Sequence, residues 1–408
     1  MRPTMTDIFV ARQPIFDQDR HVQAYELLFR GGRLAGVGGY DHQETAIRML
    51  NNTVMGFGLD ALLGGKPGLL AIPHEVLLGG EVTALPSQRI VLHVAAPNDD
   101  DPQILAACEE ARRAGFGVAL SDESGTASAA MYELADYINV DFRRLDDDGR
   151  RTLAATHRRD RRKLIAKHVT SYAEFYSAQE AGFDLFQGSF FCEPEVFSGK
   201  DVSATSHSMA MLIAEVNRPE IDLDALEELI KRDIALSVKL LRYLNSAGMG
   251  WRHEVSTIGQ ALRLLGQRPA RKWASLVAMT MIPADKPREL VTTSLIRGQF
   301  CEEIGAAELG EQRRPELFLV GLLSTLDALL DRPLPLLVSE MALSPVCSAA
   351  LLGEDTPLGR YLGLTIAYDQ GDWDRVDALC AKTGLAPELL PEAYHKTLAW
   401  VGEVMRVE

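Results

Sequence analysis

The chain has 408 residues, of which 47% are hydrophobic and 24% charged, and its formal net charge is −15 at neutral pH. This length favours two domains of roughly 200 residues each, and the composition is typical of folded rather than disordered protein. The negative charge argues against general nucleic-acid binding, because a phosphate backbone would repel most of such a surface.

The cysteines show no CxxC pair and no metal-ligand spacing. Such scattered thiols are typical of a reducing compartment. No apolar stretch approaches the roughly 18–20 residues of a membrane span. Asp7 and Arg12 lie where a signal peptide would need an apolar run. We therefore predict a cytoplasmic chain with no membrane contact, no cofactor and no metal.

Residues 1 to about 195 alternate short apolar stretches with longer helix-like ones such as Glu44–Met55, Pro102–Ala114 and Ala173–Ala181. Several of the apolar stretches have no polar face, as expected of parallel strands that are buried on both sides. About eight strands in this alternation favour a (β/α)8-like barrel. The predicted strands are Ile8–Ala11, Val22–Leu27, Leu69–Ile72, Ile90–Val94, Val118–Ser121, Ile138–Val140, Leu164–Ala166 and Leu185–Gln187.

In a barrel of this kind the chemistry lies at the carboxyl ends of the strands. A hydrolase with two divalent cations needs about four or five carboxylates there. The side chains at the predicted strand ends are mixed instead, and their inventory does not favour such a site. They are Glu26, Ala71, His93, Ser121, Asp122, Asn139, Asp141, Lys167 and Gln187.

Four segments in order resemble the EAL family of cyclic di-GMP phosphodiesterases, and they span nearly the whole first half. They are YELLFR from Tyr25 to Arg30, GFGVALSD from Gly115 to Asp122, INVD from Ile138 to Asp141, and the Gln187-Gly188 turn. The resemblance implies an EAL barrel in which Glu26 and Asp122 match metal-binding positions of the family.

Most of the family's other catalytic positions are substituted. The resemblance places Ala71 where the family has a metal-binding Asn, His93 and Lys167 where it has Glu, Ser121 where it has Asp, and Asn139 where it has a Lys. Replacing one ligand usually weakens a metal site severely. We therefore predict a degenerate EAL domain without phosphodiesterase activity.

Arg30 and Gln187 match family positions near the nucleotide, so relic nucleotide binding is one interpretation. We favour a structural alternative in which Arg30 pairs with Glu26. A nucleophilic triad of Ser121, His93 and Asp122 is disfavoured, because consecutive residues of a strand point to opposite faces and no GxSxG elbow surrounds the serine.

The basic stretch Arg143–Lys163 is the one concentrated positive region of the sequence. Acidic residues interrupt it and no aromatic residues interleave for base stacking. We interpret it as a solvated helix face, with a docking patch for an acidic partner as the alternative.

From Ser206 onward the strand signals disappear and helix signals follow one another. The segments RDIALSVKLLRYLNS from Arg232, ALRLLG from Ala261 and FLVGLLSTLD from Phe318 resemble the HDOD domain, a helical relative of metal-dependent HD phosphohydrolases. None of the nine histidines is followed by Asp, so the sequence offers no metal pair of the HD type. We interpret Asn245 as a helix cap, and His253 with Glu254 as loop residues without a ligand role. The predicted helices are Leu223–Lys231, Ile234–Leu244, Thr257–Leu265, Leu290–Gly305, Pro315–Leu330, Pro335–Met341, Pro345–Leu352, Leu358–Gln370, Trp373–Thr383 and Pro387–Val407.

The sequence thus predicts a degenerate EAL domain over residues 1–197 and an all-helical HDOD domain over 198–408. The pairing resembles the YuxH-type EAL-HDOD family of bacterial signal-transduction proteins. That resemblance implies regulation of motility, pili, biofilm or virulence through unidentified signalling proteins as partners, and self-association as a homodimer. We predict a scaffold or adaptor that is not an enzyme. The alternatives are a cyclic di-GMP receptor that does not hydrolyse its ligand, and a cyclic di-GMP phosphodiesterase.

Overall fold

The computed structural model describes residues 8–31, 59–96, 101–121, 127–157, 162–195, 286–341 and 343–406, with isolated positions between 222 and 272. The chain divides into two compact units. The first combines the residues up to Glu193 with Ala367–Asp377 and Ala386–Gly402, and the second combines Pro194–Ile366 with Ala378–Leu385 and the residues after Gly402.

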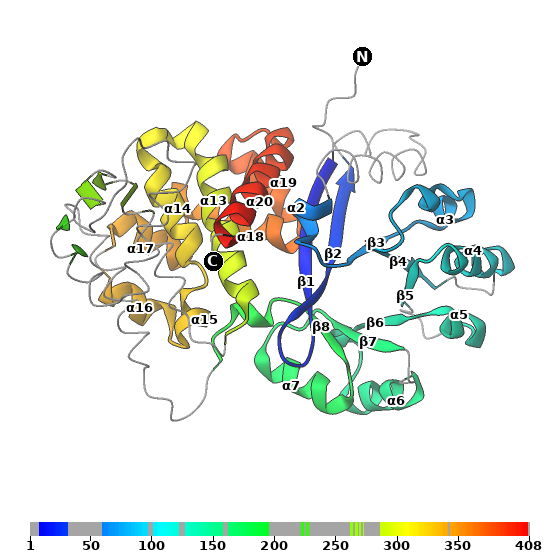
Figure 1. Cartoon of the computed structure of the whole chain (residues 1–408). Helices are drawn as coiled ribbons and strands as arrows, with labels where there is room; N and C mark the ends of the chain where they lie inside the picture. Colours follow the sequence, from blue (N-terminus) through cyan, green and yellow to red (C-terminus); the bar gives the residue numbers. More distant parts are fainter. Residues whose placement is uncertain are drawn as a thin grey trace, which may run out of the picture. The chain divides into compact units, whose positions relative to one another are not determined.

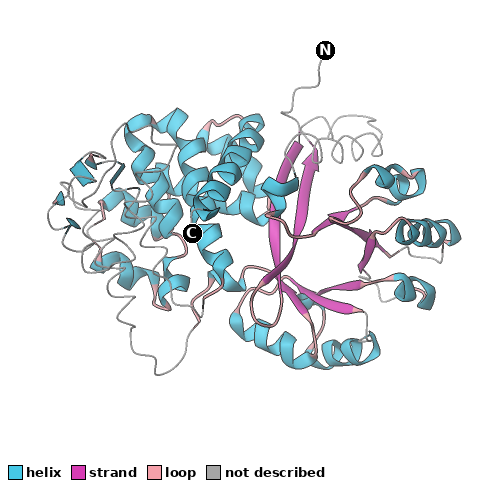
Figure 2. Cartoon of the chain, in the orientation of Figure 1, coloured by secondary structure: helices cyan, strands magenta, loops and turns pink. Residues whose placement is uncertain are grey.

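The first unit contains an eight-stranded closed barrel whose strands follow one another in chain order (Figures 1 and 2). This confirms the predicted barrel. The strands are β1 (Ile8–Phe16), β2 (Val22–Gly31), β3 (Gly68–Ala71), β4 (Ile90–Ala95), β5 (Gly117–Ser121), β6 (Tyr137–Asp141), β7 (Lys163–Lys167) and β8 (Leu185–Gln187).

The barrel departs from eightfold parallel geometry at its first strand. β1 runs antiparallel to both β2 and β8, whereas β2 through β8 are mutually parallel. Only residues 17–21 separate β1 from β2, and a parallel connection needs about a dozen or more. The Asp17 carboxylate closes this hairpin by accepting hydrogen bonds from the backbone N–H groups of Asp19 and His21.

Helices connect the parallel strands, and their ends follow local capping signals. Asp101, Ser128 and Ser171 accept backbone hydrogen bonds as N-caps, and Gly182 ends a helix with a left-handed φ of 99°. The predicted helix Glu44–Met55 lies outside the described residues. The described α-helices of the barrel are α2 (Leu59–Leu63), α3 (His74–Gly79), α4 (Pro102–Arg113), α5 (Ala129–Leu134), α6 (Asp147–His157) and α7 (Tyr172–Ala181).

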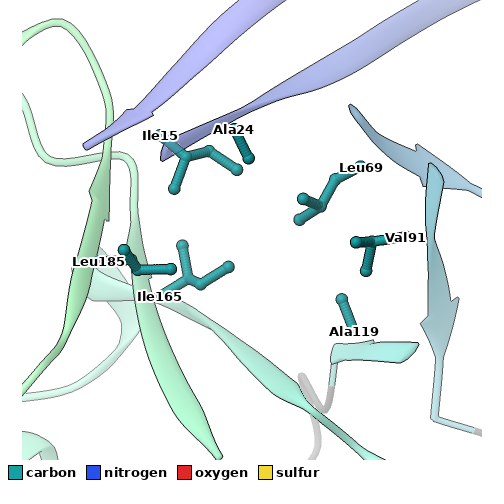
Figure 3. Close-up of a cluster of buried hydrophobic side chains, with 7 residues drawn as sticks. All are labelled: Ile15, Ala24, Leu69, Val91, Ala119, Ile165 and Leu185. Atoms are coloured by element: carbon teal, nitrogen blue, oxygen red, sulfur yellow. The ribbon is translucent and has the colours of Figure 1, made fainter. Parts of the chain in front are cut away.

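One layer of apolar side chains fills the barrel interior (Figure 3). These side chains come from seven of the eight strands, and Tyr137 of β6 packs against them. The layer makes the barrel a packed core rather than a pore. Its members are Ile15, Ala24, Leu69, Val91, Ala119, Ile165 and Leu185.

The described chain after residue 286 is helical, as predicted. The expected helix Pro315–Leu330 is two helices, because the Ser324 hydroxyl donates to the Gly321 carbonyl and Thr325 leaves the helical conformation with a φ of −120°. The helices are α13 (Arg288–Leu309), α14 (Arg314–Leu323), α15 (Leu326–Leu330), α16 (Leu334–Glu340), α17 (Pro345–Leu351), α18 (Pro357–Gln370), α19 (Trp373–Thr383) and α20 (Leu390–Arg406).

Most of the predicted helices between residues 223 and 265 fall outside the described residues, as do Asn245, His253 and Glu254. The division of the chain at residue 197 stays a prediction. No helix of the described part is long and apolar enough to span a bilayer.

Candidate functional site

A ring of mostly polar side chains lies directly above the apolar layer, toward the carboxyl ends of the parallel strands. Each member is two positions along its strand from a residue of the apolar layer or from Tyr137, and therefore points into the barrel from the same face. We call this ring the polar layer. It consists of Gln13, Glu26, Ala71, His93, Ser121, Asn139, Lys167 and Gln187.

The structure thus brings together seven of the residues that the sequence singled out. Asp122 lies outside the described residues. Gln13 was missed, because the first strand was predicted to end at Ala11 whereas β1 continues to Phe16. The alternation of side chains along a longer β1 is the signal that would have placed Gln13 beside Glu26, its register partner on β2.

Glu26 is the centre of the layer, with 4% of its side chain exposed. Its Oε1 accepts a hydrogen bond of 2.8 Å from Lys167 Nζ, and its Oε2 accepts one from Gln187 Nε2. The same Gln187 amide donates to Gln13 Oε1 at 3.0 Å. Lys167, which lies on β7, thus neutralises the buried carboxylate of Glu26 on β2.

Burial alone would raise the pKa of Glu26, because desolvation disfavours the charged form. A hydrogen bond from His93 and the positive charge of Lys167 outweigh that effect and hold the pKa well below its usual range. Glu26 is therefore a carboxylate at neutral pH, and it is already committed to neighbours within the protein.

His93 connects Glu26 to Ser121. His93 Nδ1 lies 3.2 Å from Glu26 Oε1, and His93 Nε2 lies 2.6 Å from Ser121 Oγ. Asp122, the carboxylate of the disfavoured triad, lies outside the described residues, and the carboxylate that His93 faces is Glu26 on β2.

Asn139 is the register partner of Ser121 on the neighbouring strand. It is 4% exposed, and neither Oδ1 nor Nδ2 has a hydrogen-bond partner in the described structure. Buried amides are normally satisfied. Ala71, by contrast, is exposed at the end of β3. The layer therefore holds an unused amide and reaches solvent beside His93, the register partner of Ala71.

Arg30 lies outside the polar layer, near the end of β2. Its guanidinium donates to both carboxylate oxygens of Asp377 at 2.7 and 2.9 Å and to the Trp373 carbonyl at 3.0 Å. It also stacks over the Phe9 ring, 4.7 Å from the ring centroid. The favoured alternative in which Arg30 pairs with Glu26 is wrong, because Glu26 pairs with Lys167 and Arg30 with Asp377.

Several basic residues of the stretch after β6 engage nearby acidic groups. Arg143 and Arg144 pair with Asp141, and Arg150 pairs with Asp147. Residues 158–161 lie outside the described part. The docking patch stays an untested alternative.

The comparisons with known proteins agree with the two-part organisation. The HDOD domain model matches residues 203–330. Over 99% of its length the chain is 31% identical to the cyclic di-GMP phosphodiesterase CdgJ of Vibrio cholerae, and the match covers 94% of that protein. It is 27% identical to YuxH of Bacillus subtilis, covering 98% of this chain and 99% of YuxH.

Among solved structures, the YkuI protein of Bacillus subtilis, with an EAL domain and in complex with substrate cyclic di-GMP and calcium, is 16% identical to this chain. The match covers 56% of this chain and 73% of YkuI, with a TM-score of 0.39.

The full-length similarity to a protein named as a phosphodiesterase contradicts our prediction of a non-enzymatic scaffold or adaptor. That prediction rested on the substituted positions Ala71, His93, Ser121, Asn139 and Lys167 taken together.

The described residues of the polar layer nevertheless do not fit a divalent cation. Glu26 is the one carboxylate in the layer, and both of its oxygens already accept hydrogen bonds within the protein. The ammonium of Lys167 at 2.8 Å would repel a cation placed there. Hard cations favour charged carboxylate oxygens, and beside Glu26 the layer provides neutral amide and hydroxyl oxygens, an imidazole and an ammonium.

Proposed function

Since the chain belongs to the family of EAL-HDOD proteins that includes CdgJ and YuxH, we propose that cyclic di-GMP is the ligand of its barrel. The observation that carries the proposal is the polar layer, which lies at the carboxyl ends of the parallel strands, where barrels of this kind bind their ligands. Hydrolysis of the same ligand is the second candidate, and the name of the full-length relative CdgJ favours it.

Two groups of the layer suit an anionic nucleotide. Lys167 is a part-buried ammonium that donates to Glu26 within the described part of the chain, and an ammonium has three N–H groups to offer. Asn139 carries a buried amide with donor and acceptor capacity unused among the described residues. Phosphate oxygens accept from both kinds of donor, and a guanine edge exchanges hydrogen bonds with an amide.

Arg30 is the third group. A guanidinium that grips a carboxylate through two N–H groups can grip a phosphate in the same way. Its present partner Asp377 is 56% exposed, so the exchange of Asp377 for a phosphate moves a group that is already at the surface. We further propose that the EAL barrel is degenerate in one respect, namely the loss of ligands for divalent cations.

Calorimetry of the full chain with cyclic di-GMP tests ligand binding, with cyclic di-AMP and GTP as competitors. We expect saturable binding that Arg30→Ala weakens by at least about tenfold, since a charge-assisted hydrogen bond contributes about 1.5–3 kcal/mol. Arg360→Ala, which removes a similar guanidinium from its exposed pair with Asp355, is the matched control and should leave the affinity unchanged. No heat and no displacement at about 100 μM nucleotide would overturn the proposal. A Kd of that size corresponds to a binding free energy of about −5.5 kcal/mol.

Protein partners and homodimer formation stay predictions from the sequence. Light scattering across the micromolar range tests the dimer, and a mass that stays at that of one chain would contradict it.

A further inference from the structure

The residues at the expected metal-ligand positions form a chain of close polar contacts. Ser121 Oγ lies 2.6 Å from His93 Nε2, and His93 Nδ1 lies 3.2 Å from Glu26 Oε1. With its proton on Nδ1, His93 faces the Glu26 carboxylate with the protonated nitrogen and accepts a hydrogen bond from the Ser121 hydroxyl at Nε2. A hydroxyl, an imidazole and a buried carboxylate in this order are the parts of a serine nucleophile with its general base.

Each of the three comes from a different strand: Glu26 from β2, His93 from β4 and Ser121 from β5. Strands hold side chains more rigidly than loops, and the apolar layer directly below fixes the floor of the site. Glu26 is held in turn by Lys167 and Gln187. The imidazole therefore lies between the Ser121 hydroxyl and a carboxylate that is itself held in place.

Asn139 adds a hydrogen-bond donor for the negative charge that develops during the reaction. It lies in register with Ser121 on the adjacent strand, and its buried amide is unused in the described structure. An amide N–H beside the nucleophile is the kind of donor that stabilises a developing oxyanion. A purely structural network would be expected to satisfy this amide, because an unpaired buried polar group costs about 1–3 kcal/mol.

The site is open to a reactant. Ser121 and His93 are both partly exposed, and Ala71, which lies beside His93 on β3, is exposed. The Lys167 ammonium, which pairs with Glu26, lies at the same level of the barrel with further N–H groups. A phosphodiester, which carries one negative charge, suits this combination of a nucleophile, an amide donor and an ammonium.

We propose that Ser121, His93 and Glu26 form a serine relay that opens a cyclic dinucleotide by attack on phosphorus. The proposal rests on the proposed function, and it explains how a relative of a phosphodiesterase can carry a layer that does not fit divalent cations. Ser121 and His93 are the catalytic residues, and Glu26 is a positioning residue that acts through His93.

The reaction balances with water as the sole co-reactant. Ser121 Oγ forms a bond to phosphorus and passes its proton to His93 Nε2, while the bond from phosphorus to the ribose 3′ oxygen breaks and that oxygen takes the proton. Water then attacks the phosphoserine diester, gives a proton to His93, and Ser121 leaves and recovers it. The product is a linear dinucleotide with a 5′ phosphate.

A fluorophosphonate probe tests the relay without any nucleotide, because it reacts at phosphorus with a serine that a histidine activates. We expect an adduct on Ser121 of the full wild-type chain, located by peptide mass spectrometry. His93→Gln should slow labelling by at least about a hundredfold, as expected for loss of a general base. Ser339→Ala, which removes an exposed serine of α16, is the control and should not change the labelling.

Turnover of cyclic di-GMP in the presence of EDTA is the second measurement. We expect a linear product that Ser121→Ala abolishes, with thermal melting to verify that the variant is folded. An adduct without nucleotide binding would support the relay and overturn its substrate together with the proposed function. Nucleotide binding without an adduct would overturn the relay alone, and so would turnover that requires Mn²⁺ and survives Ser121→Ala.

Discussion

At the scale of single residues, the polar layer is organised by one charge pair. Glu26 is 4% exposed and Lys167 18% exposed along their side chains, and 2.8 Å separates the carboxylate from the ammonium. Such a pair contributes little beyond an apolar substitute of the same shape, but losing one partner leaves the other charge buried and uncompensated. Lys167 was predicted to mark a lost ligand, whereas its contact with Glu26 gives it a structural role that no motif records.

Lys167→Met should lower the free energy of unfolding by about 3 kcal/mol, because it leaves Glu26 buried without its counter-charge. Urea denaturation at pH 7 measures the change. Lys396→Met removes the same group from the exposed pair with Glu392 on α20 and should cost less than about 0.5 kcal/mol. Equal effects of the two substitutions would contradict the buried role of Lys167.

The pH dependence of this effect has a definite sign. In the wild type the pKa of Glu26 is depressed, so its stabilising contribution is present above the unfolded pKa near 4.3 and is lost only as the pH falls through the folded value. Lys167→Met removes one cause of the depression and raises the folded pKa. The destabilisation by the substitution should therefore be larger at pH 7 than at pH 4, and a difference that is independent of pH would contradict this origin.

At the scale of elements, the sequence predicted the positions of the strands better than the direction in which β1 runs beside its neighbours. β8 and α19 have the predicted bounds. An apolar run defines the strand and a helical period defines the helix, each between clear stop signals. The antiparallel β1 was not predicted, because its direction follows from the short 17–21 turn and not from the apolar pattern of the strand. The break between α14 and α15 was missed as well, because a hydroxyl that competes for a backbone carbonyl leaves the apolar period intact.

The packing of α13 on α14 depends on a glycine that the sequence pattern does not distinguish. A Cβ added at Gly321 would lie 2.2 Å from the Arg297 carbonyl oxygen, so the two helix backbones meet there. Gly321→Ala should lower the melting temperature of the chain, because overpacking costs about 1–3 kcal/mol. Gly363→Ala on α18, where the nearest atom would be 3.6 Å away at Leu379, should be neutral or stabilising by up to about 1 kcal/mol. Equal melting temperatures of the two variants would contradict the close approach.

At the scale of the whole molecule, the unit that holds the barrel is not one continuous stretch of sequence. Residues Ala367–Asp377 and Ala386–Gly402 belong to it, although they follow the HDOD match by more than thirty positions. Trp373 packs edge-on against Phe9 of β1 with the ring centroids 6.1 Å apart, and the Gln370 carbonyl accepts from Gln13. The hydrophobic pattern of the sequence does not predict such a contact, because the strand and the helix each show their own pattern whether or not they meet.

These contacts bring a carboxylate of α19 to the guanidinium that is expected to hold a phosphate. Asp377 and a bound nucleotide would compete for Arg30, so Asp377→Asn should tighten cyclic di-GMP binding. The exposed position of Asp377 limits the gain to about 1 kcal/mol, or about two- to fivefold in Kd. Asp355→Asn, which breaks the comparable Arg360 pair on α18, is the control and should leave Kd unchanged. Calorimetry at two salt concentrations measures both variants, and the gain should shrink at higher salt because the lost competitor is an exposed charge. Weaker binding by Asp377→Asn would instead mean that the carboxylate holds Arg30 in the orientation that the ligand needs.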